Sequence, residues 1–420
     1  MRRAFAALAL AATASAQGMK IQISGAERAR YKIAAPRPLG DADLAAELED
    51  ALAMDFRMVG LFDVLDPRGF LAKLDVEGMG IAAPDWTSVG AQGVIKARVT
   101  RVGGDAALEA RFYEVARPLA PAVERTDRAA VADVRRLAHR FANDVYRHLT
   151  GEDGPFLTRI LYVRPSGRAK DIVAVDVDGH RPTVLVANGA DNVLPAWAPG
   201  GDRIAWTSLL WLNPDLFEAR LGARPRRLSR HAGLNIGAAF SPDGRTIALT
   251  LSKDGNAEIY LVRAADGEIL ARLTDHPGID ASPSFSPDGA QLAFVSNRQG
   301  SPQIWVMPAS GGAAKRVTFQ GNYNQSPRFS PRSDVSQIAF TGRDERGRFD
   351  VFVLDLAAGT TQRVTQNQGD NWEPTWAPGG RLLAFASSRG GIWVATPDGQ
   401  HQAQIVKGAA ETPVWSPMRK

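Results

Sequence analysis

The sequence has none of the patterns that would identify a catalytic or metal centre. Its 420 residues include no cysteine, which excludes disulfides, thiolate metal ligands and a cysteine nucleophile. It contains no G-x-S-x-G motif of α/β-hydrolases and no H-E-x-x-H motif of zinc peptidases. The six histidines are scattered along the chain. We therefore expect a protein that is not an enzyme, with no catalytic residues, no metal and no cofactor.

Long apolar runs and a strong charge of one sign are also missing. No run of eighteen apolar residues occurs, so we expect no direct membrane insertion. Residues 1–16 begin with Arg2 and Arg3, continue with a short apolar stretch and end in Ala-Ser-Ala, which is typical of a signal peptide cleaved before Gln17. Without those two arginines, 48 of the 50 basic residues remain against 45 acidic ones. This even balance does not indicate nucleic acid as a partner.

A repeated phrase is the strongest positive signal in the sequence. From residue 190 onward an aromatic residue is followed by Ser or Ala, then Pro, and usually Gly. The aromatic residues of the six copies are Trp197, Phe240, Phe285, Phe329, Trp376 and Trp415. They are separated by 43, 45, 44, 47 and 39 residues. A four-stranded blade of a β-propeller repeats about every 40–45 residues, so the phrase predicts one blade per copy.

The number of blades follows from the strands around each phrase. Second, third and fourth strands come after it as short alternating segments, although the third strand is poorly marked between 209 and 222. The sixth copy stops after its first strand, and segments 158–163, 171–179 and 182–187 resemble the three strands that it lacks. We therefore expect the C-terminal strand to pair with the start of the propeller and close a ring of six blades, which removes exposed sheet edges.

The N-terminal part lacks the repeat. Helical spacing of apolar residues covers 41–56 and 129–151, and strand alternation covers 61–66, 89–102 and 107–116. The order α-β-β-β-α predicts a small α/β domain in front of an all-β propeller. The predicted organisation is a signal peptide at 1–16, an α/β domain at 17–150, a linker at 151–157 and a six-bladed β-propeller at 158–420.

Partners of propellers usually dock where the loops that lead into the innermost strands converge. Two residues before its aromatic residue each copy has another proline, which we call the repeated proline: Pro195, Pro283, Pro327, Pro374 and Pro413, with Ala238 in its place in the second copy. Three residues before the repeated proline, five of the six copies have a short polar residue: Asn192, Asn235, Asp280, Asn324 and Asn371, with Ala410 in the sixth. Such a ring can present donors and acceptors to a partner, or each side chain can cap its own turn, and both can hold together. One residue before the proline, the copies differ, as recognition of an asymmetric partner requires: Leu194, Gly237, Ser282, Ser326, Glu373 and Thr412.

The segment RRLAHRFANDVYRHLTGEDGPFLTRILYV (135–163) resembles the junction between the two domains of the TolB family, periplasmic proteins of the Tol-Pal system. The repeated phrase, the six-fold count and the signal peptide agree with this resemblance, which covers essentially the mature chain. It implies a non-enzymatic periplasmic protein, which we expect to be monomeric, that binds the Pal lipoprotein at the propeller mouth and TolA at its N-terminal strand. It also implies a role in outer-membrane integrity and division, contacts with other outer-membrane proteins, and use by colicins.

The resemblance also places the two interfaces on this chain. Matching the Pal-contacting loops of the family gives Asn235, Ala238, Ala281 and Ser282 as equivalents. The expected Pal-binding mouth comprises Asn192, Asn235, Ala238, Asp280, Ala281, Ser282, Asn324, Asn371, Glu373 and Thr412. The expected TolA-binding strand, within 18–24, comprises Met19, Lys20, Ile21, Gln22 and Ile23. Such an alternating strand can add to a partner sheet or pair within its own domain, and the sequence leaves both open.

Two further functions are compatible with an exported propeller. A glycan-active hydrolase would need a pair of carboxylates at the mouth, for which Asp280, Glu373 and Glu411 are the candidates. A lectin-like binding module would need no catalytic group, and nothing in the sequence singles it out.

Overall fold

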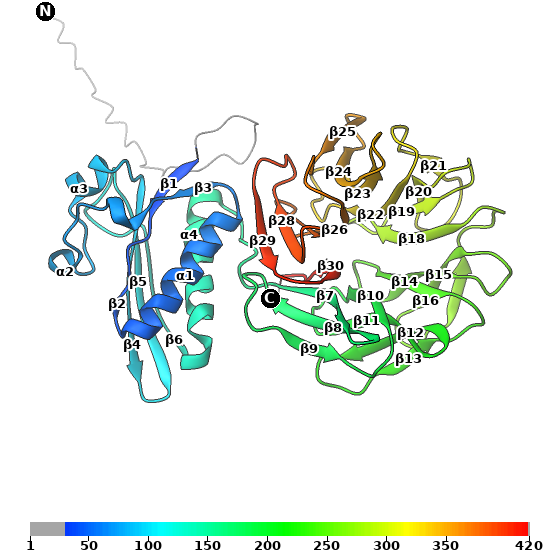
Figure 1. Ribbon diagram of the computed structural model, residues 1–420, viewed down its shortest axis with the longest axis horizontal. Helices are drawn as coiled ribbons and strands as arrows, with labels where there is room; N and C mark the ends of the chain where they lie inside the picture. The colour runs from blue at the N-terminus through cyan, green and yellow to red at the C-terminus, as the bar shows by residue number, and fades with distance from the viewer. Residues whose placement is uncertain (1–29, 419–420) are drawn as a thin grey trace, which may run out of the picture.

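The computed structural model describes residues 30–418, which form an α/β domain beside a six-bladed β-propeller (Figure 1). The predicted signal peptide, the segment 18–24 and the last two residues lie outside the described residues. No helix within residues 30–418 is long and apolar enough to cross a membrane.

The N-terminal domain is built on one mixed sheet. Its strand order is β3-β1-β4-β5-β6, and β2 also pairs with β4. The strands are β1 (Tyr31–Ala34), β2 (Leu39–Gly40), β3 (Phe62–Val64), β4 (Gly93–Val102), β5 (Asp105–Glu114) and β6 (Val123–Ala130). The helices are α1 (Ala42–Met58), α2 (Leu74–Glu77), α3 (Ala83–Ser88) and α4 (Val134–Thr150), with 3-10 turns η1 (Pro67–Gly69) and η2 (Val131–Asp133). Helices α1 and α4 share one core with the sheet, and Trp86 of α3 centres a second, smaller core.

The order α-β-β-β-α is incomplete, because the sequence analysis missed β1, β2, β6 and the short helices. It also began the second long helix too early, since residues 129 and 130 belong to β6 and α4 begins at Val134. Strand β6 has the sequence VERTDRAA, and its residues alternate between half-buried and exposed. An edge strand of this kind has no apolar side for hydrophobic periodicity to detect.

Each propeller blade is a four-stranded antiparallel sheet; sequence neighbours pair in five blades, and in the sixth the last strand of the chain pairs with the first strand of the propeller. The innermost strands are β10 (Asn192–Trp197), β14 (Asn235–Phe240), β18 (Asp280–Phe285), β22 (Asn324–Phe329), β26 (Asn371–Trp376) and β30 (Glu411–Trp415). The second strands are β11 (Arg203–Trp211), β15 (Thr246–Leu251), β19 (Gln291–Ser296), β23 (Gln337–Arg343), β27 (Leu383–Ser387) and β7 (Arg159–Ser166).

The outer half of each blade is less regular. The third strands are β12 (Asn213–Arg220), β16 (Glu258–Arg263), β20 (Gln303–Pro308), β24 (Phe349–Asp355), β28 (Ile392–Ala395) and β8 (Ala169–Asp176). The outermost strands are β13 (Arg226–Ser229), β17 (Ile269–Arg272), β21 (Lys315–Arg316), β25 (Thr360–Arg363), β29 (Gln402–Val406) and β9 (Thr183–Val186). The segment 209–222, poorly marked in the sequence, thus forms the end of β11 and a regular β12.

The ring closes as the repeat predicted. Strand β30 pairs with β7, with Trp415 opposite Ile160 and Val414 opposite Leu161. The Trp415 side chain is buried, and its indole N–H donates to the Thr158 hydroxyl at 2.7 Å. The last strand of the chain therefore holds the first strand of the propeller.

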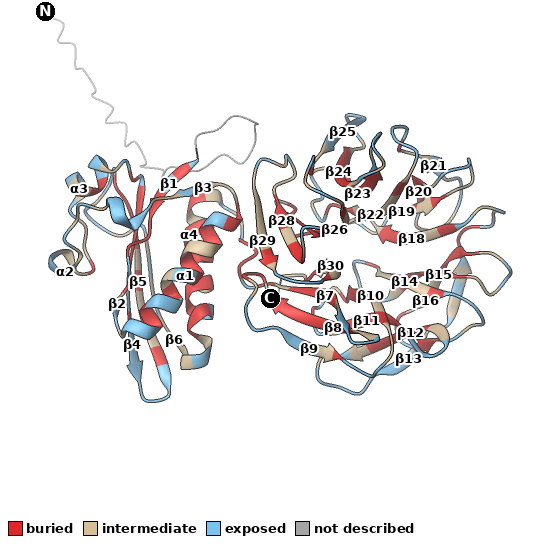
Figure 2. Cartoon of the chain, in the orientation of Figure 1, coloured by how far each residue is buried: buried red, intermediate tan, exposed pale blue. Residues whose placement is uncertain are grey.

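The two domains share a continuous apolar core. Phe156, from the connection between α4 and β7, packs against Phe56 and Tyr146 of the N-terminal domain. The same cluster includes Leu382 and Trp415 of the propeller. Figure 2 shows the corresponding buried stretches of α1 and α4. Because this core is uninterrupted, the N-terminal domain is fixed against one side of the ring.

Candidate docking surface on the propeller

The propeller has two faces that differ in their loops. We define the mouth face by the loops leading into the innermost strands and by the hairpin tips between second and third strands. The opposite face carries the Ser/Ala-Pro turns between first and second strands, and we call it the proline face. The N-terminal domain contacts loops of the proline face: Arg135 and His139 lie against Asp178 of the β8–β9 loop, and Glu152 pairs with Arg381. Within residues 30–418, the N-terminal domain therefore leaves the mouth face uncovered.

The ring of five short polar residues lies beneath the mouth face. All five side chains are buried: Asn192, Asn235, Asp280, Asn324 and Asn371. Asn235 accepts hydrogen bonds from the Ser229 hydroxyl at 2.7 Å and from the His231 N–H at 2.9 Å, and donates to the His231 carbonyl at 2.7 Å. Asn192 likewise donates to the Ala190 carbonyl at 3.0 Å. Turn capping is observed for the four asparagines, whereas the Asp280 carboxylate pairs with the Arg298 guanidinium. Burial withdraws all five polar groups from a docking partner.

The position before each repeated proline has a feature that the sequence did not reveal. All six residues there have positive φ, between 48° and 68°: Leu194, Gly237, Ser282, Ser326, Glu373 and Thr412. Each lies where the pairing of the first and second strands shifts register. The left-handed region costs a non-glycine residue on the order of 1–2 kcal/mol. Strain repeated around one opening points to a constrained functional surface.

The other predicted mouth residues differ in how far their side chains are buried and in what they contact. Ala281, Ser282 and Glu373 are half-buried, Thr412 is buried, and Ala238 lines the central cavity. The Glu373 carboxylate accepts from the Thr412 N–H at 2.8 Å. Burial raises the pKa of Glu373, although the Thr412 hydrogen bonds oppose the shift. Ser282 and Glu373 thus both combine a strained backbone with a half-buried polar side chain, and of the two only Glu373 is engaged by Thr412.

Two of the three carboxylates considered for glycan hydrolysis are engaged in ion pairs. Asp280 is fully buried and pairs with the Arg298 guanidinium at 2.6 Å. Glu411 pairs with Lys170 at 2.6 Å. Asp280 cannot reach a substrate from its buried position, so one of the three candidates for a catalytic pair is removed.

Exposed apolar residues gather on the mouth face, and the sequence analysis did not identify them. The β11–β12 hairpin tip has Trp211 at 55% exposure and Leu212 at 95%. The full set, which we call the apolar rim, is Leu209, Leu210, Trp211, Leu212, Leu234, Ile279 and Phe319. The guanidinium of Arg227 lies 4.5 Å from the centre of the Trp211 ring. Neighbouring exposed apolar side chains mark interaction sites, and the LLWL run at 209–212 is the part of the apolar rim that is contiguous in the sequence.

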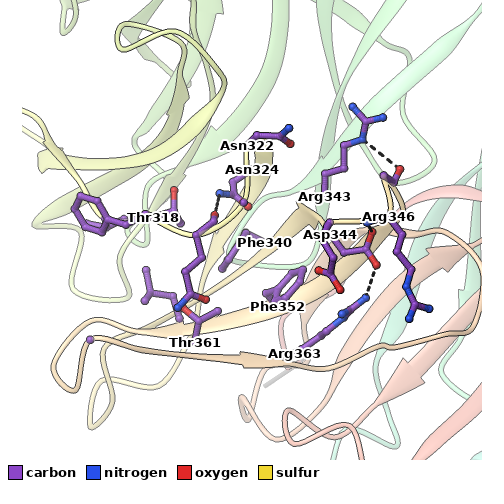
Figure 3. Close-up of a pocket in the computed structure, with 18 residues that line it drawn as sticks. Thr318, Asn322, Asn324, Phe340, Arg343, Asp344, Arg346, Phe352, Thr361 and Arg363 are labelled. Carbon is purple, nitrogen blue, oxygen red and sulfur yellow. Dashed lines mark hydrogen bonds and ion pairs between the residues drawn. The ribbon is translucent and has the colours of Figure 1, made fainter.

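A large hollow opens beside this rim. It has a volume of about 990 Å³ and lies between the loop around Phe319, the β23–β24 hairpin tip and strands β24 and β25. Figure 3 shows Phe340 and Phe352 at its floor and Arg343 and Arg363 at its wall. The Asp344 carboxylate accepts from the Arg363 guanidinium at 2.8 Å. Aromatic and charged groups are therefore both available to a side chain that enters from the mouth face.

Comparison with known families agrees with this architecture. Residues 146–419 match the family model of the TolB beta propeller domain, and residues 19–118 match that of the TolB amino-terminal domain. This chain belongs to the TolB family. A Tol-Pal system protein TolB from Anaeromyxobacter sp. (strain K) is 43% identical over 100% of this chain and 99% of its own. The TolB protein of Myxococcus xanthus (strain DK1622) is 40% identical over 84% of this chain and 82% of its own.

The TolB fold is also found among solved structures. The crystal structure of TolB from Acinetobacter baumannii matches with a TM-score of 0.80 at 25% identity, covering 93% of this chain and 98% of that one. The TolB architecture of an α/β domain and a six-bladed propeller is therefore established for this chain. Within residues 30–418, no group of three or more His, Asp or Glu side chains is arranged to hold a metal ion.

Proposed function

We propose that this TolB-family protein is a non-enzymatic periplasmic binding component of a Tol-Pal system. Pal docks on the mouth face of the propeller, and TolA binds the N-terminal strand at 18–24. Linking these partners supports outer-membrane integrity and envelope constriction at division. The observation that carries the proposal is the coincidence of five strained non-glycine positions and the apolar rim on the face that the N-terminal domain leaves uncovered.

The Pal interface is best tested at Ser282, which is half-buried at the mouth. A Pal interface of ordinary size buries about 1,600 Å² in total. An arginine in place of Ser282 would project from the centre of that contact, so Ser282→Arg should weaken Pal binding at least about 100-fold in titration calorimetry, equivalent to about 2.8 kcal/mol. Leu212→Ser, which removes an exposed apolar contact, should weaken it by roughly tenfold.

The matched control is Ser310→Arg. Ser310 is exposed in the β20–β21 loop, on the proline face, so the same substitution there should leave the Pal affinity unchanged. If Ser282→Arg binds Pal as tightly as the unmodified protein, the mouth face is not the Pal interface.

The alternating apolar and polar residues of segment 18–24 allow a test of the TolA interface. Successive side chains of a strand point to opposite faces, so a strand added to TolA would have Ile21 and Ile23 on one face and Lys20 and Gln22 on the other. Replacing both isoleucines by aspartate should abolish TolA capture in a pull-down and leave Pal binding intact. Replacing Lys20 and Gln22 by alanine should retain TolA, because main-chain pairing and the apolar face persist. Full TolA capture by the aspartate variant would contradict the assignment.

A further inference from the structure

A second feature of the propeller lies on its axis. A cavity of about 550 Å³ runs between the innermost strands and is lined at the proline face by one proline from every blade: Pro199, Pro242, Pro287, Pro331, Pro378 and Pro417. Its walls are otherwise the repeated aromatic rings and small side chains. This cavity is separate from the hollow beside the apolar rim.

One position in this cavity breaks the six-fold pattern. The residue after each repeated proline, or after Ala238 in the second copy, lines the cavity and is small or uncharged in five blades. The six residues are Ala196, Ala239, Ser284, Arg328, Thr375 and Val414. Arg328 is the sole charged side chain among the described residues that line the cavity. An arginine at a position otherwise occupied by small residues brings a guanidinium into the centre of the ring.

The protein supplies few hydrogen bonds and no paired carboxylate to compensate the positive charge of the Arg328 guanidinium. Within residues 30–418 its side chain donates a single long hydrogen bond, from Nη1 to the Pro327 carbonyl at 3.3 Å, and forms no ion pair. Burial lowers the pKa of Arg328, opposed by the more distant charge of Glu373. The Glu373 carboxylate is engaged with Thr412 instead.

An arginine in this condition is suited to one class of ligand. Its guanidinium has five N–H donors in a planar fork, which matches the paired oxygens of a carboxylate, phosphate or sulfate. A positive charge that is partly removed from water is destabilising unless an anion or hydrogen bonds compensate it. The cavity is large enough for such an ion with water, and the proline-lined opening gives a route into it.

We propose that the central cavity binds a small oxyanion through the guanidinium of Arg328. The oxyanion enters from the proline face and occupies the space that small residues leave free in the other five blades. Arg328 follows the strained Ser326 by two residues along β22, toward the proline face. The inference rests on the lining of the cavity and not on the identity of the partner that docks at the mouth.

The test is thermal unfolding of the full mature chain with phosphate, sulfate or acetate, against chloride at the same ionic strength. A ligand that binds the folded state alone raises its stability as its concentration passes Kd, so we expect a saturable rise in Tm of about 2–3 °C. Arg328→Gln should abolish the rise, and Arg328→Lys should diminish it because an ammonium lacks the fork. Arg245→Gln removes a guanidinium whose side chain is 87% exposed, and it should keep the full rise.

Two outcomes would overturn the proposal. One is an equal rise in Arg328→Gln, because the effect would then be a general salt effect. The other comes from a measurement that needs no variant: the ³¹P resonance of phosphate should broaden with the unmodified protein and sharpen again when acetate competes. An unbroadened line excludes phosphate binding, and broadening that acetate does not reverse excludes a shared oxyanion site. Both readouts leave Pal binding untouched, so failure here is distinguishable from failure of the mouth-face proposal.

Discussion

Replacing Trp415 with alanine should lower the free energy of unfolding by about 3–5 kcal/mol. The side chain is 5% exposed and belongs to the core shared by both domains. Its removal leaves a cavity and leaves the Thr158 hydroxyl without the indole N–H that it accepts at 2.7 Å. It also loosens β30, the strand that closes the ring on β7. We expect the loss as a lower urea midpoint, followed by far-UV circular dichroism.

The matched control for this truncation is Trp211→Ala. The same side chain is deleted there, but Trp211 is 55% exposed at the β11–β12 hairpin tip, so the loss should be about 1 kcal/mol or less. Hydrogen exchange separates the two further: the amides of β7 should lose protection in the Trp415 variant and keep it in the Trp211 variant. Equal midpoints for the two variants would show that the closing strand contributes no special stability.

The propeller could be predicted because the same sequence pattern occurs once in every blade. Each blade has its own aromatic residue and its own proline turn, so an irregular copy does not change the count, and the unfinished sixth copy predicted the Trp415–Ile160 pairing. The N-terminal domain has no such redundancy. Its edge strand β6 carries charged residues on both faces, and β1 is four residues long, so neither has a periodicity that a single sequence can reveal.

The sequence predicted which residues lead into the innermost strands, but not how deeply they are buried or which backbone conformation they adopt. The polar ring of Asn192 and its equivalents was found, yet its burial depends on how the loops fold over it. Leu194, Glu373 and Thr412 adopt positive φ although none of these residue types favours it, because the register shift of the innermost strands imposes the conformation. The run at 209–212 looked like a weak strand, and only the hairpin placed it on the mouth face.

A buried ionic network joins the two domains. His139 of α4 lies between two carboxylates: its Nδ1 is 2.8 Å from Asp55 of α1, and its Nε2 is 3.2 Å from Asp178 of the propeller. The guanidinium of Arg135 also contacts Asp178, at 2.8 Å. Burial opposes a charge on the imidazole, but the two carboxylates outweigh burial and raise the pKa of His139 to about 10. Burial raises the pKa of Asp55 to about 6 against the opposing effect of His139.

These shifts give the stability a definite dependence on pH. An unfolded histidine has a pKa of about 6.5, so the stabilisation from protonated His139 is fully present below that pH and is lost as the pH rises toward about 10. Each pH unit in this window removes about 1.4 kcal/mol. Asp55 contributes its own change below about pH 6, outside the window. We therefore expect the free energy of unfolding to fall by about 3 kcal/mol between pH 7 and pH 9.

The double variant His139→Gln/Asp55→Asn should lose this slope, because it replaces the titrating pair by neutral groups that can still share a hydrogen bond. His148→Gln is the matched control: His148 lies on the same helix, but its partner at 2.9 Å is Glu114 of the N-terminal domain. It should therefore keep the slope of the unmodified protein. Urea unfolding at several pH values from 7 to 9 gives the comparison, and parallel curves for the double variant and the unmodified protein would show that this network is not what titrates. Because Asp178 belongs to the propeller and His139 to the N-terminal domain, a slope confined to proteins with an intact network would mean that alkaline pH weakens the contact between the domains.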